Sequence, residues 1–478
     1  MRPAVALLFG AWVAGIVLGV NGQVAAAAVG AAAAAALGWR RSGQVAAAAS
    51  AVLLLGFMYG HADHLDPHQD CSVGDTLAGT IAARPDIRET NIRYLVADER
   101  GCRFFVYAER WPIYERGTMV TVEDGRYESS EAVSPEQPGF ARFLAAQRIA
   151  GAWSYPTIQA AAARLPDGQG GGDDEHYRAL VERTHRVFSE PTASLAGALL
   201  LGDRGQFPAE LLEDFRRTSL THILSISGAH ISLLTGLVFA LVGRLSLRPW
   251  VRTTLVIALL WIYVWFVGAP IPAVRAGFFW SAALVALRAG LLVSLPTAIL
   301  LTLAIVLTWR PSLAVDIGLQ LSFLAVAGIG TAVFSTKPWS RRWREGSLWR
   351  ALQSAAAVSL GATLFTWPLI SHHFGLVSLS AVVANLLILP AVPIIMVGSV
   401  LAIGVSYMSP LAGYLAALPV QAAAAWMIGV ARVLSRAPGG AVEFTAPGWL
   451  VPLYYGGLII TLALVVKWQK RHWREIWE

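Results

Sequence analysis

The stretch LTHILSISGAHISLL, residues 220–234, lies within an apolar run at 219–242 that is long enough to cross a bilayer as a helix. Similar runs recur along the 478 residues, of which 56% are hydrophobic and 14% charged. Soluble domains contain about 25% charged residues, so this composition excludes a soluble enzyme, a fibrous protein and a disordered chain. The runs also lack the short alternating segments of an outer-membrane barrel. They predict a polytopic α-helical membrane protein.

Twelve membrane spans are predicted, three before the longest polar stretch and nine after it. They are 4–20, 24–37, 45–59, 219–242, 251–267, 272–289, 291–308, 313–334, 350–370, 377–405, 409–431 and 449–466. Short cytoplasmic loops hold the excess of Lys and Arg, and with Met1 inside the basic loops all fall on one face. Both termini are therefore expected in the cytoplasm and the polar stretch outside. A cleaved secretory signal over residues 1–28 stays open as an alternative.

The polar stretch divides into a β-favouring part and a helical part. Pieces such as RYLVAD at 93–98 and TMVTVED at 118–124 lie between turn residues, which predicts a small antiparallel β-barrel or sandwich. Amphipathic helix is expected over 139–153 and a flexible linker at 168–175, followed by helices along the membrane surface. The predicted division of the chain is 1–60 (N-terminal membrane helices), 61–138 (β domain), 139–218 (surface helices and linker), 219–467 (helical bundle) and 468–478 (basic tail).

Polar side chains inside predicted spans are the candidate functional residues, because each is costly there unless it ties helices together or lines a wet path. The candidates are His222, Ser225, Ser227, Gly228, His230, Arg275, Asp316, Gln320 and Asn385. On one ideal helix the two histidines would lie about 80° apart and could face one cavity, although Ser227 and Gly228 between them could interrupt or kink that helix. The sequence leaves open whether these groups join helices or line a path.

Arg275 and Asp316 are the charged pair among these candidates. An ion pair between them is one interpretation, and exposure of Arg275 to an anionic substrate is the other. Prolines near both Arg275 and Asn385 predict broken or bent helices, which membranes tolerate where the break is buried or lines a cavity. Together these features favour a translocation path over a passive anchor.

Motifs for catalysis and cofactor binding are missing from the sequence. It contains no GxxxxGK[ST], HExxH or CxxC, so no enzyme activity, cofactor or metal site is predicted. HADHLDPH at 61–68 contains metal-capable side chains but is interpreted as a solvated collar. Cys71 and Cys102 both fall in the polar stretch, which is compatible with a disulfide if that stretch lies in an oxidising compartment.

Four motifs now point to a known family. They are ALLLGDRGQFPAELLEDFRRTSLTHILSISGAHISLL at 198–234, PIPAVRAGFFW at 270–280, DIGLQLSFLAVAGI at 316–329 and NLLILP at 385–390. In these motifs and their order the chain resembles the ComEC family, bacterial inner-membrane proteins of natural transformation, from about residue 60 to 435. The resemblance implies a channel that passes one DNA strand into the cytoplasm, an external OB-fold domain, and a disulfide between Cys71 and Cys102.

Two departures from the family pattern bear on this interpretation. Many members continue into a metallo-β-lactamase-like domain, whose HxHxDH motif this sequence lacks, so nuclease activity is expected to be absent or to be supplied by another polypeptide. Residues 61–134 contain 8 Arg against 14 Asp and Glu, whereas OB folds that bind single strands offer a basic groove. A local basic patch could still bind DNA. Its candidates are Arg84, Arg88, Arg93, Arg103 and Arg110.

The sequence thus predicts an inner-membrane channel for single-stranded DNA import during competence. Its expected partners are single-stranded DNA, membrane lipid and other competence proteins, namely an external DNA receptor, a separate nuclease and a cytoplasmic motor, with homo-oligomerisation left open. Two alternatives remain: transport of another anionic solute on the same bundle, and a membrane-tethered module that binds a partner outside.

Overall fold

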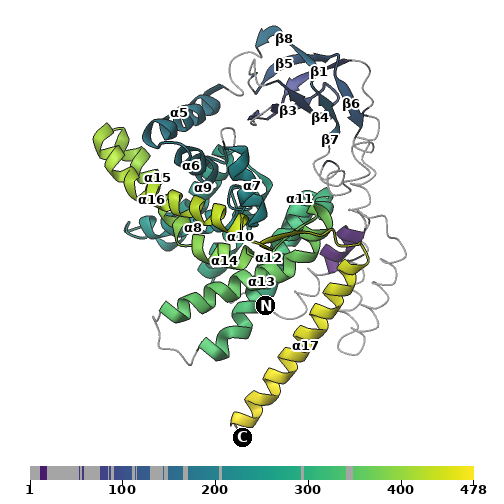
Figure 1. Ribbon diagram of the computed structural model, residues 1–478, viewed down its shortest axis with the longest axis vertical. Coiled ribbons are helices and arrows are strands. Elements are labelled where there is room, and N and C mark those ends of the chain that lie inside the picture. The colour runs from purple at the N-terminus through teal and green to yellow at the C-terminus, as the bar shows by residue number, and fades with distance from the viewer. Residues whose placement is uncertain are drawn as a thin grey trace.

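The computed structural model describes two regions, a β-sheet region and a mainly helical region (Figure 1). The described residues are 11–18, most of 76–164, then 171–203, 207–291, 295–340 and 348–477, with isolated residues between 53 and 58 and at 71, 114 and 144. The three predicted N-terminal spans lie outside the described residues except for 11–18 and the isolated residues near 56.

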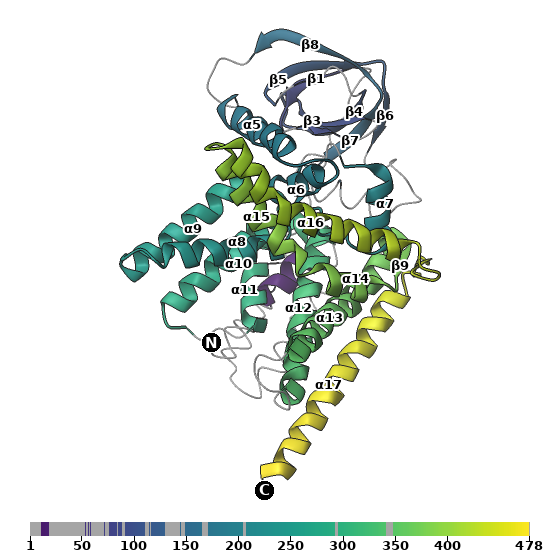
Figure 2. The same cartoon turned by 60° about the vertical axis from the view of Figure 1, so that its left-hand side comes forward.

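The β region is one eight-stranded sheet that curls on itself (Figure 2). Its strands are β1 (Thr76–Ile81), β2 (Asp86–Ile87), β3 (Ile92–Ala97), β4 (Arg103–Ala108), β5 (Thr118–Glu123), β6 (Arg126–Ser129), β7 (Ile149–Ser154) and β8 (Thr157–Arg164). The order is β6-β7-β4-β3-β1-β5-β8, with β2 beside β3. All of these pairings are antiparallel except β4 with β7.

Strands β3 and β4 show why these residues fold as a sheet. Alternate side chains of β3 are buried, the period-2 pattern of a strand with one face in a core. Tyr94 and Phe104 lie in that core with Trp153, so the first two are not available to stack on bases. Burial raises the pKa of the Tyr94 phenol, and its oxygen accepts a hydrogen bond from the Tyr114 amide at 3.1 Å.

The amphipathic helix expected over 139–153 is wrong at its C-terminal end. Residues 149–154 form β7, which lies between β4 and β6. A Cβ added at Gly151 would lie 2.6 Å from the Glu128 carbonyl oxygen and 2.6 Å from the Tyr127 ring. A glycine at this position lets the strands approach, and the pairing that results overrides local helical spacing. The sheet therefore extends to Arg164, beyond the boundary expected at residue 138.

The helical region contains α5 to α17. Its elements are α5 (Gly171–Val187), α6 (Thr192–Leu201), α7 (Ala209–Arg217), α8 (Gly228–Val242), α9 (Pro249–Phe266), α10 (Ile271–Arg288), α11 (Leu295–Trp309), η2 (Pro311–Val315), α12 (Ile317–Ser340), α13 (Leu348–Phe374), β9 (Leu376–Ser378), α14 (Ala381–Ile388), α15 (Ala391–Ser406), α16 (Pro410–Ser435), β10 (Ala441–Glu443) and α17 (Leu450–Trp477). The linker expected at 168–175 is wrong from Gly171 onward, because the helix of the following residues extends back to that point at little cost.

Six helical segments in the described residues are long and apolar enough to cross a membrane. They are Pro249–Phe266, Ile271–Arg288, Ile317–Ser335, Ala351–Phe374, Ala381–Ser406 and Pro410–Ser435. The protein is therefore a mainly helical membrane protein with a separate small β-sheet region. The predicted span at 219–242 is wrong over its first turns, because α8 begins only at Gly228. The predicted break near Pro390 is confirmed, since α14 ends at Ile388 and α15 starts at Ala391.

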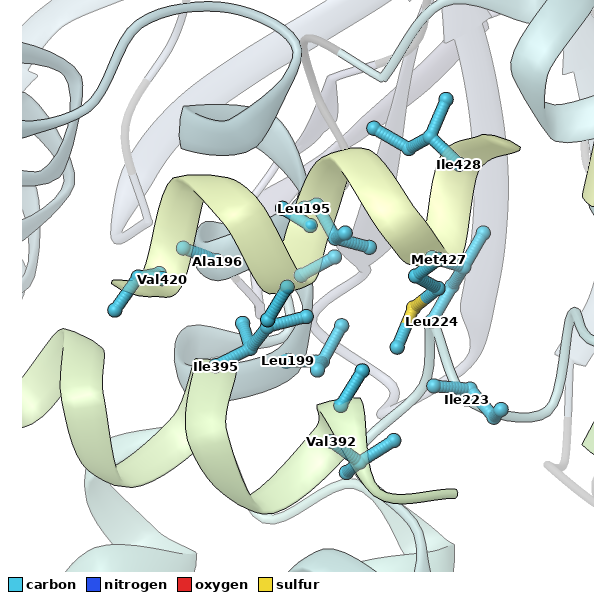
Figure 3. Packing of buried hydrophobic residues seen from close by; sticks show 14 of the residues in the cluster. Leu195, Ala196, Leu199, Ile223, Leu224, Val392, Ile395, Val420, Met427 and Ile428 are labelled. Atoms are coloured by element: carbon cyan, nitrogen blue, oxygen red, sulfur yellow. The ribbon is translucent and has the colours of Figure 1, made fainter. Parts of the chain in front are cut away.

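A large apolar cluster joins α6 to α14, α15 and α16 (Figure 3). Leu195 and Leu199 of α6 face Ile395 of α15 and Met427 of α16. All four side chains are fully or almost fully buried. This cluster fixes one side of the loop that precedes α8.

Candidate functional site

The loop 219–227 is held on both of its sides. Leu220 and Leu224 are buried in the cluster with α6, α15 and α16, whereas Ile226 is buried against α9 and α10. The loop thus bridges two parts of the helical region. The loop is not helical and α8 begins at Gly228, so the interruption expected at Ser227 and Gly228 is confirmed and the two histidines do not share one helix.

His222 lies in this loop and is exposed. Its Nδ1 donates to the Ser219 carbonyl oxygen at 2.8 Å, and the Ser225 hydroxyl donates to the His222 carbonyl oxygen at 3.0 Å. Ser219 has a positive φ of 60°, a conformation that interrupts regular helix. Local side-chain bonds thus stabilise the turn.

His230 is placed by the N-terminus of α8. Its side chain is almost fully buried, and its Nδ1 accepts a hydrogen bond from the Ser227 amide at 3.3 Å. This is a capping interaction, because the amides at a helix start have no partner within the helix. Gly228 is the first residue of α8 and is exposed. A Cβ added at Gly228 would lie 3.9 Å from its nearest neighbour, the Ala276 Cβ of α10. The starts of α8 and α10 therefore lie close together.

A second link between α8 and α10 was not predicted from the sequence. The Trp280 indole N–H donates to the Ser232 hydroxyl at 2.9 Å, and that hydroxyl donates to the Gly228 carbonyl oxygen at 2.7 Å. Nothing in the local sequence pairs Ser232 with a residue 48 positions away. The link joins the second turn of α8 to the middle of α10.

The predicted ion pair between Arg275 and Asp316 is confirmed. Nη1 of Arg275 lies 3.7 Å from Oδ1 of Asp316, and the two side chains are 7% and 5% exposed. Oδ1 of Asp316 also accepts the Leu319 amide at 2.6 Å, so this aspartate caps the start of α12. Nε and Nη1 of Arg275 have no hydrogen-bond partner in the part of the chain described.

Gln320 and Asn385 occupy different places. The Gln320 side chain donates to the Ala314 carbonyl oxygen at 3.0 Å, which fastens η2 to the first turn of α12. Asn385 is half-buried on α14, which packs mainly on α13 and α16. The structure therefore gathers Gly228, Arg275 and Asp316 near the starts of α8, α10 and α12, and places Asn385 in another part of the bundle.

Two of the five basic candidates of the β region can be placed. Arg93 and Arg103 lie on the same outward face of β3 and β4, where Arg93 pairs with Tyr107 and Arg103 with Ala97. The Arg93 guanidinium lies 4.5 Å from the centre of the Phe105 ring. Four residues of strand, about 13 Å, separate the two basic positions. Arg84, Arg88 and Arg110 lie outside the described residues.

The cysteines form the disulfide Cys71–Cys102 in the β region. Among described residues no group of three or more His, Cys, Asp or Glu side chains is placed to hold a metal ion. HADHLDPH at 61–68 lies outside those residues.

Comparison with known proteins decides the family. Residues 199–469, more than half of the chain, match the family described as Competence protein. The chain belongs to the Competence family. All nine candidate residues of the predicted spans fall inside the Competence match, whereas the β region precedes it.

Two curated proteins are similar to this Competence family member. ComE operon protein 3 of Bacillus subtilis (strain 168) is 27% identical over 217 residues, which is 44% of this chain and 26% of that protein. The uncharacterized protein YcaI of Escherichia coli (strain K12) is 27% identical over 305 residues, 60% of this chain and 36% of that protein. The chain thus spans about a quarter to a third of the length of these relatives. No solved structure matches it significantly.

Proposed function

We propose that this protein takes part in DNA uptake during natural transformation and conducts single-stranded DNA through the bacterial inner membrane. The match of residues 199–469 to the Competence family carries the proposal. The similarity to ComE operon protein 3 agrees with it.

The interior chemistry supports an anionic cargo. A phosphodiester strand carries one negative charge per nucleotide and loses hydration when it enters a membrane. The starts of α8 and α10 lie together, and the start of α12 lies beside Arg275. Helix N-termini carry partial positive charge, and Arg275 adds a guanidinium whose charge Asp316 balances. His222 lies in the loop before α8 and Gly228 begins that helix, and both residues are exposed, so the proposed path passes this point.

The finer architecture belongs to the same proposal. Twelve spans would place both termini in the cytoplasm and the β region outside, in the oxidising compartment that a disulfide requires. There the β region would act as an OB-like domain that receives DNA. Arg93 and Arg103 are its proposed DNA contacts, together with Arg84, Arg88 and Arg110. The domain division is proposed as predicted, with the β domain extended to Arg164.

We also propose that the protein acts as a channel and not as an enzyme. The strand that stays outside would be degraded by a separate nuclease. An external receptor would deliver the DNA, and a cytoplasmic motor would draw it in. The sequence motifs and the Competence family match support this proposed division of labour.

Deletion of the gene in its host tests the function. Labelled DNA should no longer reach a DNase-resistant state, transformants should fall to background, and the wild-type gene should restore both. In the complemented strain, His230→Ala should depress transformation at unchanged protein abundance, because it removes the cap of α8 beside the path. His176→Ala, an exposed histidine on α5, is the matched control.

Other outcomes would favour the alternatives. Normal DNA uptake by the deletion strain, together with loss of a different anion transport, would support a carrier on the same bundle. Full activity of a β region released from its membrane anchor would support a tethered binding module. If abundance falls in proportion to transformation in His230→Ala, the histidine serves the fold alone.

A further inference from the structure

Arg275 is a buried charge with an incomplete set of partners. The residue is 6% exposed, yet its contact with Asp316 is 3.7 Å, longer than the roughly 2.7–2.9 Å of a charge-assisted hydrogen bond. Nε and Nη1 both lack a hydrogen-bond partner among the described residues. Buried donors without acceptors are costly and rare. The two unpaired donors on one guanidinium indicate that another acceptor binds there.

Asp316 is held back from completing the pair. Its Oδ1 accepts the Leu319 amide at 2.6 Å and caps α12, and its carbonyl oxygen accepts the Gln320 amide at 3.1 Å. The Gln320 side chain in turn fastens the preceding turn through the Ala314 carbonyl oxygen. These bonds fix the Asp316 carboxylate to the start of α12. At its 3.7 Å distance from Nη1 of Arg275, the carboxylate neutralises the guanidinium but does not accept hydrogen bonds from all of the Arg275 donors.

A glycine keeps the space beside both charges open. A Cβ added at Gly318 would lie 3.1 Å from Oδ1 of Asp316 and 3.8 Å from Nη1 of Arg275. Any larger residue would place carbon next to the carboxylate and guanidinium. At Gly318 the start of α12 therefore places no side chain against the charged pair.

We propose that Arg275 is an anion site for a single phosphodiester group and that Asp316 is its internal competitor. The fork of guanidinium donors fits phosphate oxygens. When a phosphate binds, it takes the donors that Asp316 leaves unpaired, and Asp316 neutralises Arg275 again when the phosphate leaves. Competition of this kind keeps binding weak enough for release, as conduction requires. The cargo in this inference rests on the proposed function, but anion binding by the pair can be tested without it.

Binding is measured on the purified full-length protein in detergent by the change in Tm on addition of dimethyl phosphate, a phosphodiester monoanion. Neutral trimethyl phosphate is the ligand control. Asp316→Asn removes the competing charge and keeps a side chain that caps helices equally well. Asp316→Asn should bind dimethyl phosphate at least tenfold more tightly than wild type. Arg275→Gln should show no binding, and Arg288→Gln, an exposed arginine on the same helix, should behave as wild type.

A charge-free double variant separates binding from folding. Arg275→Gln alone leaves a buried unpaired carboxylate, so its abundance should fall. Arg275→Gln with Asp316→Asn removes both charges and should restore abundance but neither dimethyl phosphate binding nor transformation. Recovery of transformation in this double variant would overturn the proposal, since the pair would then serve the fold alone.

Two further results separate this inference from the proposed function. If Asp316→Asn binds dimethyl phosphate no more tightly than wild type, Asp316 is not a competitor and the inference fails, even where the deletion abolishes DNA uptake. If binding follows the expected order but the deletion strain takes up DNA normally, the anion site stands and the DNA function fails.

Discussion

The β region and the helical region differ in the polar side chains that they bury. In the β region every fully buried side chain among the described residues is apolar or aromatic. Among the residues that the structure describes, the helical region buries eighteen polar or charged side chains, including His230, Arg275 and Asp316. The large exposed apolar residues are distributed in the opposite way, with Met119 and Tyr155 in the β region and most of the others on the long helices. The surface of the β region is therefore suited to water, and the surface of the helical region is suited to lipid.

Different forces therefore stabilise the two regions. Burial of apolar area folds the sheet, because its unfolded chain would expose that area to water. Lipid gives helices no such gain, so close packing and satisfied backbone groups must hold the bundle together. Several buried hydroxyls of the bundle bond only to their own helix; Thr302, for example, donates to the Ala298 carbonyl oxygen at 2.8 Å. The Arg275–Asp316 pair is different because it joins two helices and remains incomplete.

The largest expected effect tests close packing in the bundle. Helices α12 and α13 cross at Gly328 and Gly361, where a Cβ added at Gly328 would overlap the Gly361 carbonyl oxygen. Gly328→Val should force the backbones apart and cost about 3 kcal/mol or more, measured as loss of Tm and abundance of the full chain in detergent. Gly404→Ala on α15, which meets no atom within 4 Å, is the control. An unchanged Tm for Gly328→Val would show that the crossing does not stabilise the bundle.

The next effect should be confined to the β region. The disulfide Cys71–Cys102 closes a loop over a sequence separation of 31, and replacing both cysteines with serine should cost about 3–4 kcal/mol in the chain-entropy account. Limited proteolysis of the full-length protein should then cut the β region faster and leave the helical region as resistant as in wild type. Equal loss of protection in both regions would contradict the contrast between them.

The sequence predicted what alternation and long apolar runs encode. The strands around Tyr94 and Val120 were expected from β-favouring residues that lie between turn residues. The six candidate spans fall within or close to predicted apolar runs. The Arg275–Asp316 pair could be anticipated because a buried charge in a membrane requires a partner. In each case a single segment, or a single rule about charge, carried enough information.

Features that depend on a distant partner could not be predicted in this way. Leu220 and Leu224 make residues 219–227 appear to be part of a span, but they pack on α6, α15 and α16 instead of continuing α8. Gly151 suits a strand only because Tyr127 and Glu128 lie against it. These outcomes are set by tertiary contacts, which neither propensity nor hydropathy along one segment encodes.

The smallest effect concerns one backbone carbonyl of the bundle. Pro368 lies inside α13 and has no N–H, so the Leu364 carbonyl oxygen lacks its usual partner within the helix. The Tyr454 hydroxyl of α17 donates to that oxygen at 3.0 Å. An unpaired carbonyl is costly where no water can replace the bond, so the hydroxyl attaches α17 to the proline break of α13.

A double-mutant cycle on Tm measures this bond. Tyr454→Phe should cost about 1–2 kcal/mol in the wild-type background and much less in Pro368→Ala, where the alanine N–H restores the helical bond to Leu364. Tyr414→Phe, an exposed tyrosine on α16, is the control. Equal costs in both backgrounds would mean that the hydroxyl does not serve the carbonyl freed by proline. A coupling of the expected sign would show that hydrogen bonds to backbone groups from other helices stabilise the bundle. In the β region, pairing of the strands supplies such bonds.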